Sequence, residues 1–169
     1  MKAAGIIVAV AVALALQTTL SRIAVRSTVA VDLVLVVVVY VALTSGPATG
    51  LLTGAFAGLV QDALSSPVIG IGGLAKTIVG FLAGIVGSQF IVAQSLPRFV
   101  VFFGATVLHA IVFMGLYVLL GLRQFGTPYA AVAAQAAANA VIGVVAFQLV
   151  ELLPGAVERR KAQRGRLRR

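Results

Sequence analysis

Charged side chains are scarce in this chain of 169 residues: they make up 10% of the sequence, and only four of them are acidic. A soluble domain of average composition carries about 25% charged residues, so the composition argues against a water-soluble fold. Cysteine is absent, which excludes disulfides, thiolate metal sites and cysteine nucleophiles. The single histidine, His109, cannot build a multi-histidine metal site.

The residue patterns of common catalytic sites are missing as well. Carboxylates are sparse, no glycine-rich loop enters a phosphate-binding helix, and no serine stands in a nucleophile-elbow context. The sequence therefore predicts a protein that is not an enzyme and that holds no cofactor or metal ion.

Apolar sequence is what the chain has in abundance: 61% of its residues are hydrophobic, and its mean hydropathy is +1.13. The apolar runs are each close to the roughly 20 residues that cross about 30 Å of hydrocarbon. Short breaks such as Ser45-Gly46-Pro47 separate them, so consecutive helices should be antiparallel neighbours. We predict an all-α, polytopic membrane protein with about six transmembrane helices in one bundle, with five spans as the alternative. The predicted spans are Ala3–Leu20, Val29–Thr44, Ala48–Leu64, Ile69–Ala93, Phe99–Leu122 and Tyr129–Leu153.

The first apolar run also has features of a secretory signal. Lys2 precedes it, and Ala13-Leu14-Ala15 has the small residues of a cleavage site. The run continues to Leu20 without the polar stretch that usually follows such a site. This continuity favours an uncleaved first membrane helix.

The distribution of Lys and Arg predicts the orientation, because cytoplasmic loops retain basic residues. With the N-terminus inside, the cytoplasmic side holds Lys2, Arg98 and the basic segment after Leu153. The opposite side then holds only Arg22, Arg26 and Arg123. We therefore predict a transmembrane domain over residues 1–153, a basic cytoplasmic tail over residues 154–169, and both termini in the cytoplasm.

The basic tail explains most of the net charge of +9, and no basic segment interleaved with aromatic residues occurs elsewhere, so we expect no nucleic acid partner. Near an anionic leaflet each basic residue contributes about 1 kcal/mol, which predicts that the tail lies on the cytoplasmic lipid surface. Two other roles stay open: fixing the topology, and docking to an acidic or filamentous partner. The predicted lipid contacts are Arg159, Arg160, Lys161, Arg164, Arg166, Arg168 and Arg169.

Glycines recur at helical spacing in the third and fourth predicted spans. Gly50, Gly54 and Gly58 follow one another at four-residue steps, and Gly80 and Gly84 repeat the spacing in the next span. Such stripes let helices approach closely in lipid, where association depends on van der Waals packing. They predict either packing within this bundle or a groove for a partner's helix.

Charged residues inside the spans are costly, so each needs a structural or functional reason. Asp32, Asp62 and Lys76 all fall in the outer half of the predicted bundle. The simplest expectation is an ion pair between Asp62 and Lys76 that joins the third and fourth spans.

The alternative is a polar cavity on the outer side that receives a solute or a partner's helix. Gln135 and Asn139, which are one helical turn apart in the last span, would then line it. His109 lies near the middle of the fifth span, where we expect a neutral imidazole that is hydrogen-bonded to a neighbouring helix; a proton relay is the alternative.

The order and spacing of residues between positions 46 and 84 are distinctive. They run Gly46-Pro47, Gly50, Gly54, Gly58-Leu59-Val60-Gln61-Asp62-Ala63-Leu64-Ser65-Ser66, Gly70 and Leu74-Ala75-Lys76-Thr77-Ile78-Val79-Gly80-Phe81-Leu82-Ala83-Gly84. Together with Gln17 to Leu20 and Asp32-Leu33 upstream, this stretch resembles the bacterial rod shape-determining protein MreD family. The resemblance covers about half of the chain, and the last two spans match in hydropathy and length.

The resemblance implies a small, non-enzymatic inner-membrane scaffold of the rod complex, or elongasome, which directs lateral peptidoglycan synthesis and maintains cell shape. Its implied partners are an MreC-like bitopic protein, RodA with its class B penicillin-binding protein, and the MreB filament at the cytoplasmic face. The family is also similar in helix architecture to the substrate-binding subunits of energy-coupling-factor transporters. A membrane subunit that binds a vitamin-type solute is therefore the alternative function.

Overall fold

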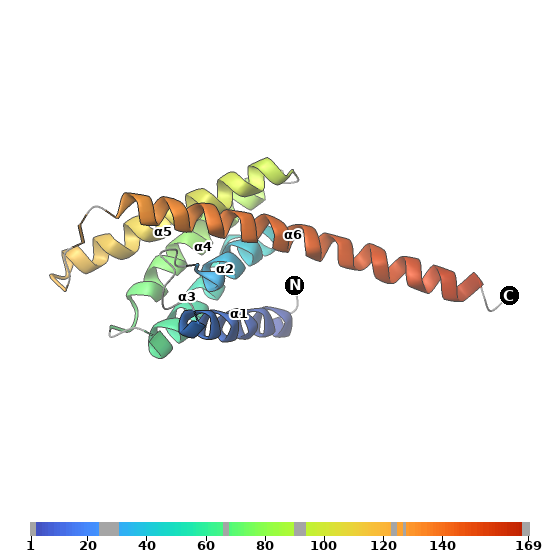
Figure 1. Cartoon of the computed structure of the whole chain (residues 1–169), viewed down its shortest axis with the longest axis horizontal. Coiled ribbons are helices and arrows are strands. Elements are labelled where there is room, and N and C mark those ends of the chain that lie inside the picture. Colours follow the sequence, from blue (N-terminus) through green and yellow to red (C-terminus); the bar gives the residue numbers. More distant parts are fainter. Residues whose placement is uncertain are drawn as a thin grey trace.

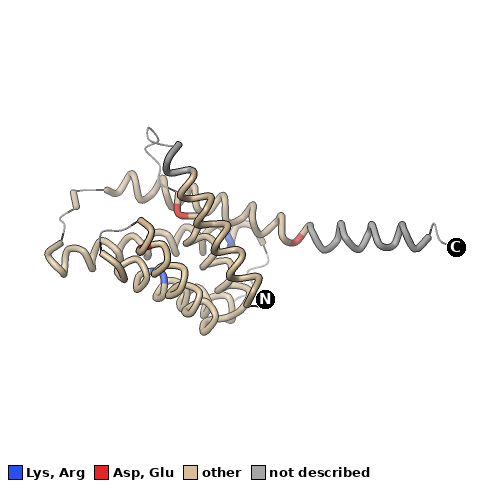
Figure 2. Tube along the Cα trace, turned by 90° about the horizontal axis from the view of Figure 1, so that it is seen from below, with Lys and Arg blue, Asp and Glu red and all other residues tan. Residues whose placement is uncertain are grey.

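The computed structural model describes residues 3–23, 31–65, 68–89, 94–122, 125–126 and 128–166. In these ranges the chain forms six helices and no strands, which confirms the all-α prediction. The helices pack into one bundle (Figure 1), and few charged residues occur along the described part of the chain (Figure 2). The helices are α1 (Ala3–Ile23), α2 (Leu33–Ser45), α3 (Pro47–Ser65), α4 (Ile71–Gln89), α5 (Ser95–Leu119) and α6 (Tyr129–Arg166).

Three helical segments in the described part of the chain are long and apolar enough to cross a membrane: Ile71–Gln89, Ser95–Leu119 and Tyr129–Leu152. The apolar segments Ala3–Thr19 and Leu33–Ser45 are shorter. α3 has 19 residues, but its glycines and polar residues make it less apolar. The architecture is that of a membrane helical bundle.

α2 begins four residues later than predicted, because Asp32 caps it. The Leu35 N–H donates a hydrogen bond of 2.9 Å to Asp32 Oδ1, as a carboxylate does at an N-cap. Residues 24–30, where the predicted span began, lie outside the described part.

α5 begins at Ser95, four residues before the predicted start at Phe99. Pro97 lies in the first turn of the helix, where its missing N–H would have had no partner within the helix. The helix ends at Leu119 and not at Leu122, because Gly121 has a φ of +67° and the Leu122 N–H donates to the Tyr117 carbonyl. This is a glycine C-terminal motif.

α6 continues as one helix to Arg166, beyond the predicted end of the last span at Leu153. The apolar part of this helix, Tyr129–Leu152, agrees with the predicted span. The residues that follow Pro154 include Ala156, Glu158 and Arg159, which are strong helix formers.

α2 lies at the centre of the bundle and is apolar on all sides, which is the pattern of a fully buried helix. On one side Val34 and Val38 pack with α1 and α3. On the other side Leu35, Val39 and Ala42 pack with residues of α4, α5 and α6. The central position of α2 brings Asp32, at its start, into the interior.

Candidate functional site

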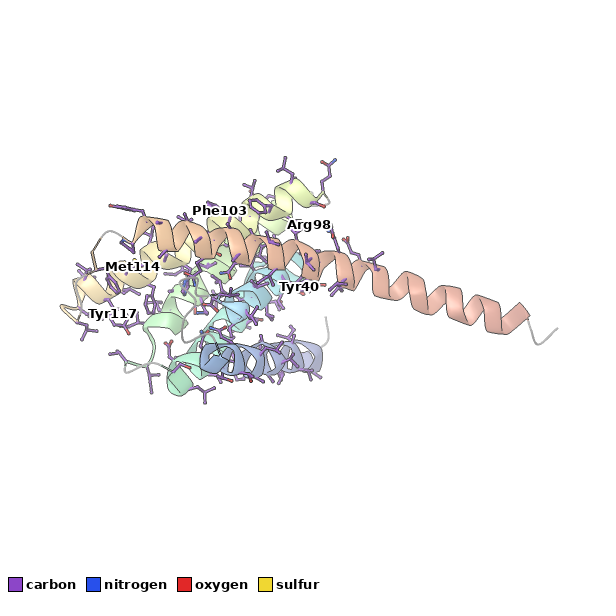
Figure 3. The ribbon with its side chains drawn as sticks, in the orientation of Figure 1. Tyr40, Arg98, Phe103, Met114 and Tyr117 are labelled. Atoms are coloured by element: carbon purple, nitrogen blue, oxygen red, sulfur yellow. The ribbon has the colours of Figure 1, made fainter. Side chains whose placement is uncertain are left out.

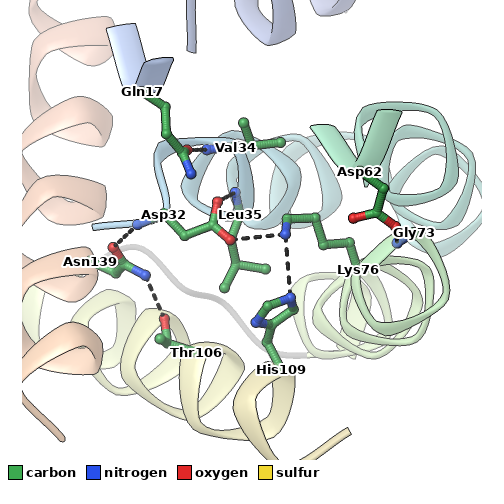
Figure 4. A network of polar contacts seen from close by, with 10 residues as sticks. All are labelled: Gln17, Asp32, Val34, Leu35, Asp62, Gly73, Lys76, Thr106, His109 and Asn139. Carbon is green, nitrogen blue, oxygen red and sulfur yellow. Dashed lines mark hydrogen bonds and ion pairs between the residues drawn. The ribbon is translucent and has the colours of Figure 1, made fainter. Parts of the chain in front are cut away.

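Asp32 makes three contacts with three different parts of the bundle (Figure 4). Its Oδ1 atom caps α2, and its Oδ2 atom lies 2.9 Å from Nζ of Lys76 on α4. Its backbone N–H donates a hydrogen bond of 3.0 Å to Oδ1 of Asn139 on α6. The side chains of Asp32 and Lys76 are 8% and 4% exposed, so this is a buried ion pair.

Lys76 also contacts His109 on α5, with 3.3 Å between Nζ and Nε2 (Figure 4). An ammonium group has donors and no acceptor, so Nε2 of His109 accepts this hydrogen bond. The imidazole is then neutral, with its proton on Nδ1, as the sequence led us to expect. The ring also stacks on Phe113, at 5.8 Å between centroids.

Asn139 extends the contacts to α5. It is fully buried, and its Nδ2 donates to Oγ1 of Thr106, which donates to the Phe102 carbonyl. Gln17 of α1 accepts a hydrogen bond from the Val34 N–H through Oε1. Together these residues form what we call the polar network: Gln17, Asp32, Lys76, Thr106, His109 and Asn139. The network connects α1, α2, α4, α5 and α6.

The predicted ion pair between Asp62 and Lys76 is wrong. The Asp62 carboxylate accepts hydrogen bonds from the N–H groups of Gly70 and Gly73, at 2.9 and 3.0 Å. These groups belong to the first turn of α4 and its N-cap, where backbone donors have no partner within the helix and a negative charge is favoured. A Cβ on Gly72 would collide with Oδ1 of Asp62. Asp62 therefore fixes the start of α4 onto the end of α3.

The glycines of α3 and α4 face each other at backbone contact. A Cβ on Gly50 would collide with the Gly80 carbonyl, and one on Gly54 would collide with the Lys76 carbonyl. A Cβ on Gly58 would lie 2.6 Å from the Gly73 Cα atom. The two stripes are packed against each other within this chain.

Gly84 extends this contact on α4, where a Cβ would collide with Pro47 at the start of α3. The backbone of Lys76 packs against Gly54 of α3, and the Lys76 side chain extends to Asp32. The rotation of α4 that packs the glycines thus directs Lys76 away from Asp62.

Gln135 and Asn139 do not form the expected polar cavity. Asn139 is fully buried, and both ends of its amide are hydrogen-bonded. Gln135 is half-buried, and within the described residues no hydrogen bond joins it to the polar network.

A cavity of about 700 Å³ lies between the C-terminal half of α5 and the N-terminal half of α6. Its lining is apolar and aromatic and includes Phe103, Met114, Val118 and Val132. Figure 3 places Met114 toward this end of α5 and Arg98 toward the other end. The described residues of its lining offer apolar surface and no charged side chain.

A second ion pair, between Arg98 and Glu151, escaped the sequence analysis. The guanidinium donates to both carboxylate oxygens, at 2.9 and 2.5 Å, and lies 4.3 Å from the centre of the Phe147 ring. α5 and α6 are antiparallel, and each residue is near the same end of the hairpin. That shared placement was the signal from which the pair could have been predicted.

The basic residues of the predicted tail belong to α6 as far as Arg166, but their side chains lie outside the described part. In the described part no group of three or more His, Cys, Asp or Glu residues could hold a metal ion. The polar network and the Arg98–Glu151 pair are thus hydrogen bonds and ion pairs that join helices of the bundle to one another.

The comparisons with known proteins give one result. A family model described as rod shape-determining protein MreD matches residues 2–155 of the chain. None of the curated proteins and none of the solved structures that were compared matches it. The family match confirms the resemblance and extends it to the last two spans, while the likeness to energy-coupling-factor subunits stays a prediction.

Proposed function

Since the chain belongs to the MreD family of rod shape-determining proteins, we propose that it is a non-enzymatic membrane scaffold of the rod complex that supports lateral peptidoglycan synthesis. The family match over residues 2–155 is the observation that carries this proposal. Its partners are an MreC-like bitopic protein, RodA with its class B penicillin-binding protein, and the MreB filament at the cytoplasmic face.

The use of polar groups favours a scaffold over a solute-binding subunit. Asp32 and Lys76 form an ion pair with each other, and Asp62 accepts hydrogen bonds from backbone N–H groups of this chain. The cavity between α5 and α6 is lined by apolar groups, whereas a polar vitamin needs hydrogen-bonding groups that fix its orientation. Contact between helices is therefore the function that these residues support best.

We place the protein in the bacterial cytoplasmic membrane with six spans and both termini in the cytoplasm. Asp32, Asp62 and the start of α4 then lie on the outer side, and Arg98 with Glu151 lies on the inner side. The basic segment from residue 154 onward lies at the cytoplasmic lipid surface, where its seven arginine and lysine residues after Glu158 meet anionic headgroups.

Co-purification distinguishes the two candidate functions. We would extract the tagged chain from its native membrane with a mild detergent and quantify the proteins recovered with it. The scaffold proposal predicts recovery of the MreC-like protein and of RodA. Recovery with energy-coupling ATPases and a bound vitamin would instead establish the transporter function.

A matched pair of variants makes the assay specific. Gly54→Leu separates α3 from α4 and should abolish recovery of the partners, whereas Gly104→Leu should retain it, because a Cβ at Gly104 meets nothing within 4 Å. Equal recovery with wild type and Gly54→Leu would show that the partners do not recognise the folded bundle.

A further inference from the structure

The contact between Lys76 and His109 joins two differently built parts of the bundle. α3 and α4 are packed backbone to backbone through glycines, and α5 and α6 are joined by Arg98 and Glu151. Lys76 is on α4 and His109 is on α5. Among the described residues, this is the hydrogen bond that spans α4 and α5 directly.

Only part of the boundary between α4 and α5 is open. Val79 and Ala83 of α4 pack in the buried core with Phe102 and Ala105 of α5, and a groove of about 210 Å³ lies beside them, lined by Leu82 of α4 and by Val100, Gly104 and Leu108 of α5, among others. His109 directly follows Leu108 at the end of this groove. The contact that His109 makes therefore closes this end of the boundary.

That contact exists in one protonation state of the ring only. Nε2 accepts from the Lys76 ammonium through its lone pair, and a proton on Nε2 occupies that lone pair. The protonated ring would place two cationic groups 3.3 Å apart. At this distance and in a medium of low polarity, like charges repel strongly.

The groups around His109 leave the second positive charge without a partner of its own. Lys76 faces it from α4 and Asp32 faces it from α2, where Asp32 is already paired with Lys76. Phe113 stacks on the ring from α5, and α6 contributes the uncharged Asn139 amide at the backbone of Asp32. Within the described polar network, Asp32 is the one carboxylate for two cations.

We propose that the Lys76–His109 contact is a pH-sensitive switch that holds α5 against α4 when His109 is neutral and releases it when the ring is protonated. α6 stays attached to α2 through Asn139 and the Asp32 backbone, and α5 stays joined to α6 through Asn139 and Thr106, because neither bond contains a titratable group. Release therefore moves the part of α5 that follows Thr106 away from α4 and widens the end of the groove at Leu108. This inference concerns the conformation of the chain alone and does not depend on the rod complex.

Spin labels measure the movement directly. The chain has no cysteine, so a Leu74→Cys, Ile111→Cys pair can be labelled without removing native thiols. Both positions are exposed, on α4 and α5 respectively. The purified chain is reconstituted in lipid nanodiscs and compared between about pH 8 and an acidic pH at which the imidazole signals show that the ring is protonated.

We expect the mean distance between the labels to increase by about 2 Å on acidification, the size of helix shifts in packed interfaces. A Leu52→Cys, Phe81→Cys pair on α3 and α4 serves as the matched control and should show no change, because both positions are exposed and glycines lock those helices together. His109→Gln should abolish the shift, because its amide oxygen accepts from Lys76 and does not titrate.

The protonation of the ring can be followed in the same samples without any substitution of His109. Because the chain has a single histidine, ¹⁵N-histidine labelling gives the signals of one imidazole. The distance change and the ring titration should have the same midpoint. A ring that titrates without a distance change, or a change of equal size in His109→Gln, would overturn the proposal.

Discussion

The helix pairs α3–α4 and α5–α6 are both antiparallel hairpins, yet they are held together by different means. In the first, glycines bring the two backbones into contact, and Asp62 fixes the start of α4. In the second, the Arg98–Glu151 ion pair joins one end, and a cavity of about 700 Å³ separates the other. The first pair is held by backbone contact along both helices, and the second by contacts between side chains, which also include the hydrogen bond between Asn139 and Thr106. The polar network around Asp32 connects the two.

The largest effect is expected from removing the carboxylate of Asp32, which connects the two hairpins through the polar network. Asp32→Ala leaves the Lys76 ammonium buried without a counter-ion, which costs about 3–5 kcal/mol, and it also removes the cap of α2. Equilibrium unfolding in mixed detergent micelles measures this loss. Adding Lys76→Met should recover roughly half of it, because the buried charge is then gone. A double variant as unstable as the single one would show that the ion pair is not what Asp32 supplies.

A leucine at Gly54 breaks the contact between α3 and α4. Its side chain would collide with the Lys76 carbonyl, so we expect a loss of about 3 kcal/mol in the free energy of unfolding, at the upper end of the cost of overpacking. Gly104→Leu on α5 is the matched control and should cost less than about 0.5 kcal/mol. Thermal unfolding of both variants in detergent tests the difference. Similar losses would contradict the backbone contact between α3 and α4.

Substitutions at Asp62 should have a smaller effect. They distinguish its hydrogen bonds to the start of α4 from the ion pair with Lys76 that the sequence predicted. Asp62→Ala removes the hydrogen bonds to Gly70 and Gly73 and should cost about 1–2 kcal/mol, the range of lost N-caps. Asp62→Asn keeps one acceptor oxygen and should cost less. Exchanging the charges, with Asp62→Lys and Lys76→Asp together, should not restore the stability that Asp62→Lys alone removes, because the two side chains do not pair. Restoration of stability by the exchange would favour the ion pair that the structure excludes.

The smallest effect is expected at the ion pair between Arg98 and Glu151. Glu151 is more than half exposed, with 55% of its side chain accessible, and exposed ion pairs contribute little. Glu151→Gln should therefore change the unfolding midpoint by less than Asp62→Asn does. Its effect should also decrease at high salt, because screening weakens exposed charges. A large loss that persists in high salt would mean that Arg98 and Glu151 act as a buried pair.

The number of helices and the glycine contacts could be predicted from the sequence, because length, hydropathy and spacing determine them. The partner of Lys76 could not, since pairing depends on the rotation of α4 about its axis. Asp62 is nearer to Lys76 along the chain, but the side chain of Lys76 runs toward α2. Hydropathy likewise did not predict that α5 starts before Pro97 or that α6 continues past Pro154, because the effect of a proline depends on its place within the turn.

Depletion of the protein from the bacterium that produces it tests the scaffold function most directly. Cell outlines and the incorporation of a fluorescent D-amino acid into the side wall would be recorded as the protein disappears and after it is expressed again. If the chain is a scaffold of the rod complex, cells should become round and lose side-wall incorporation, and re-expression of the wild-type chain should restore both. Cells that stay rod-shaped, with unchanged incorporation after complete depletion, would contradict this function.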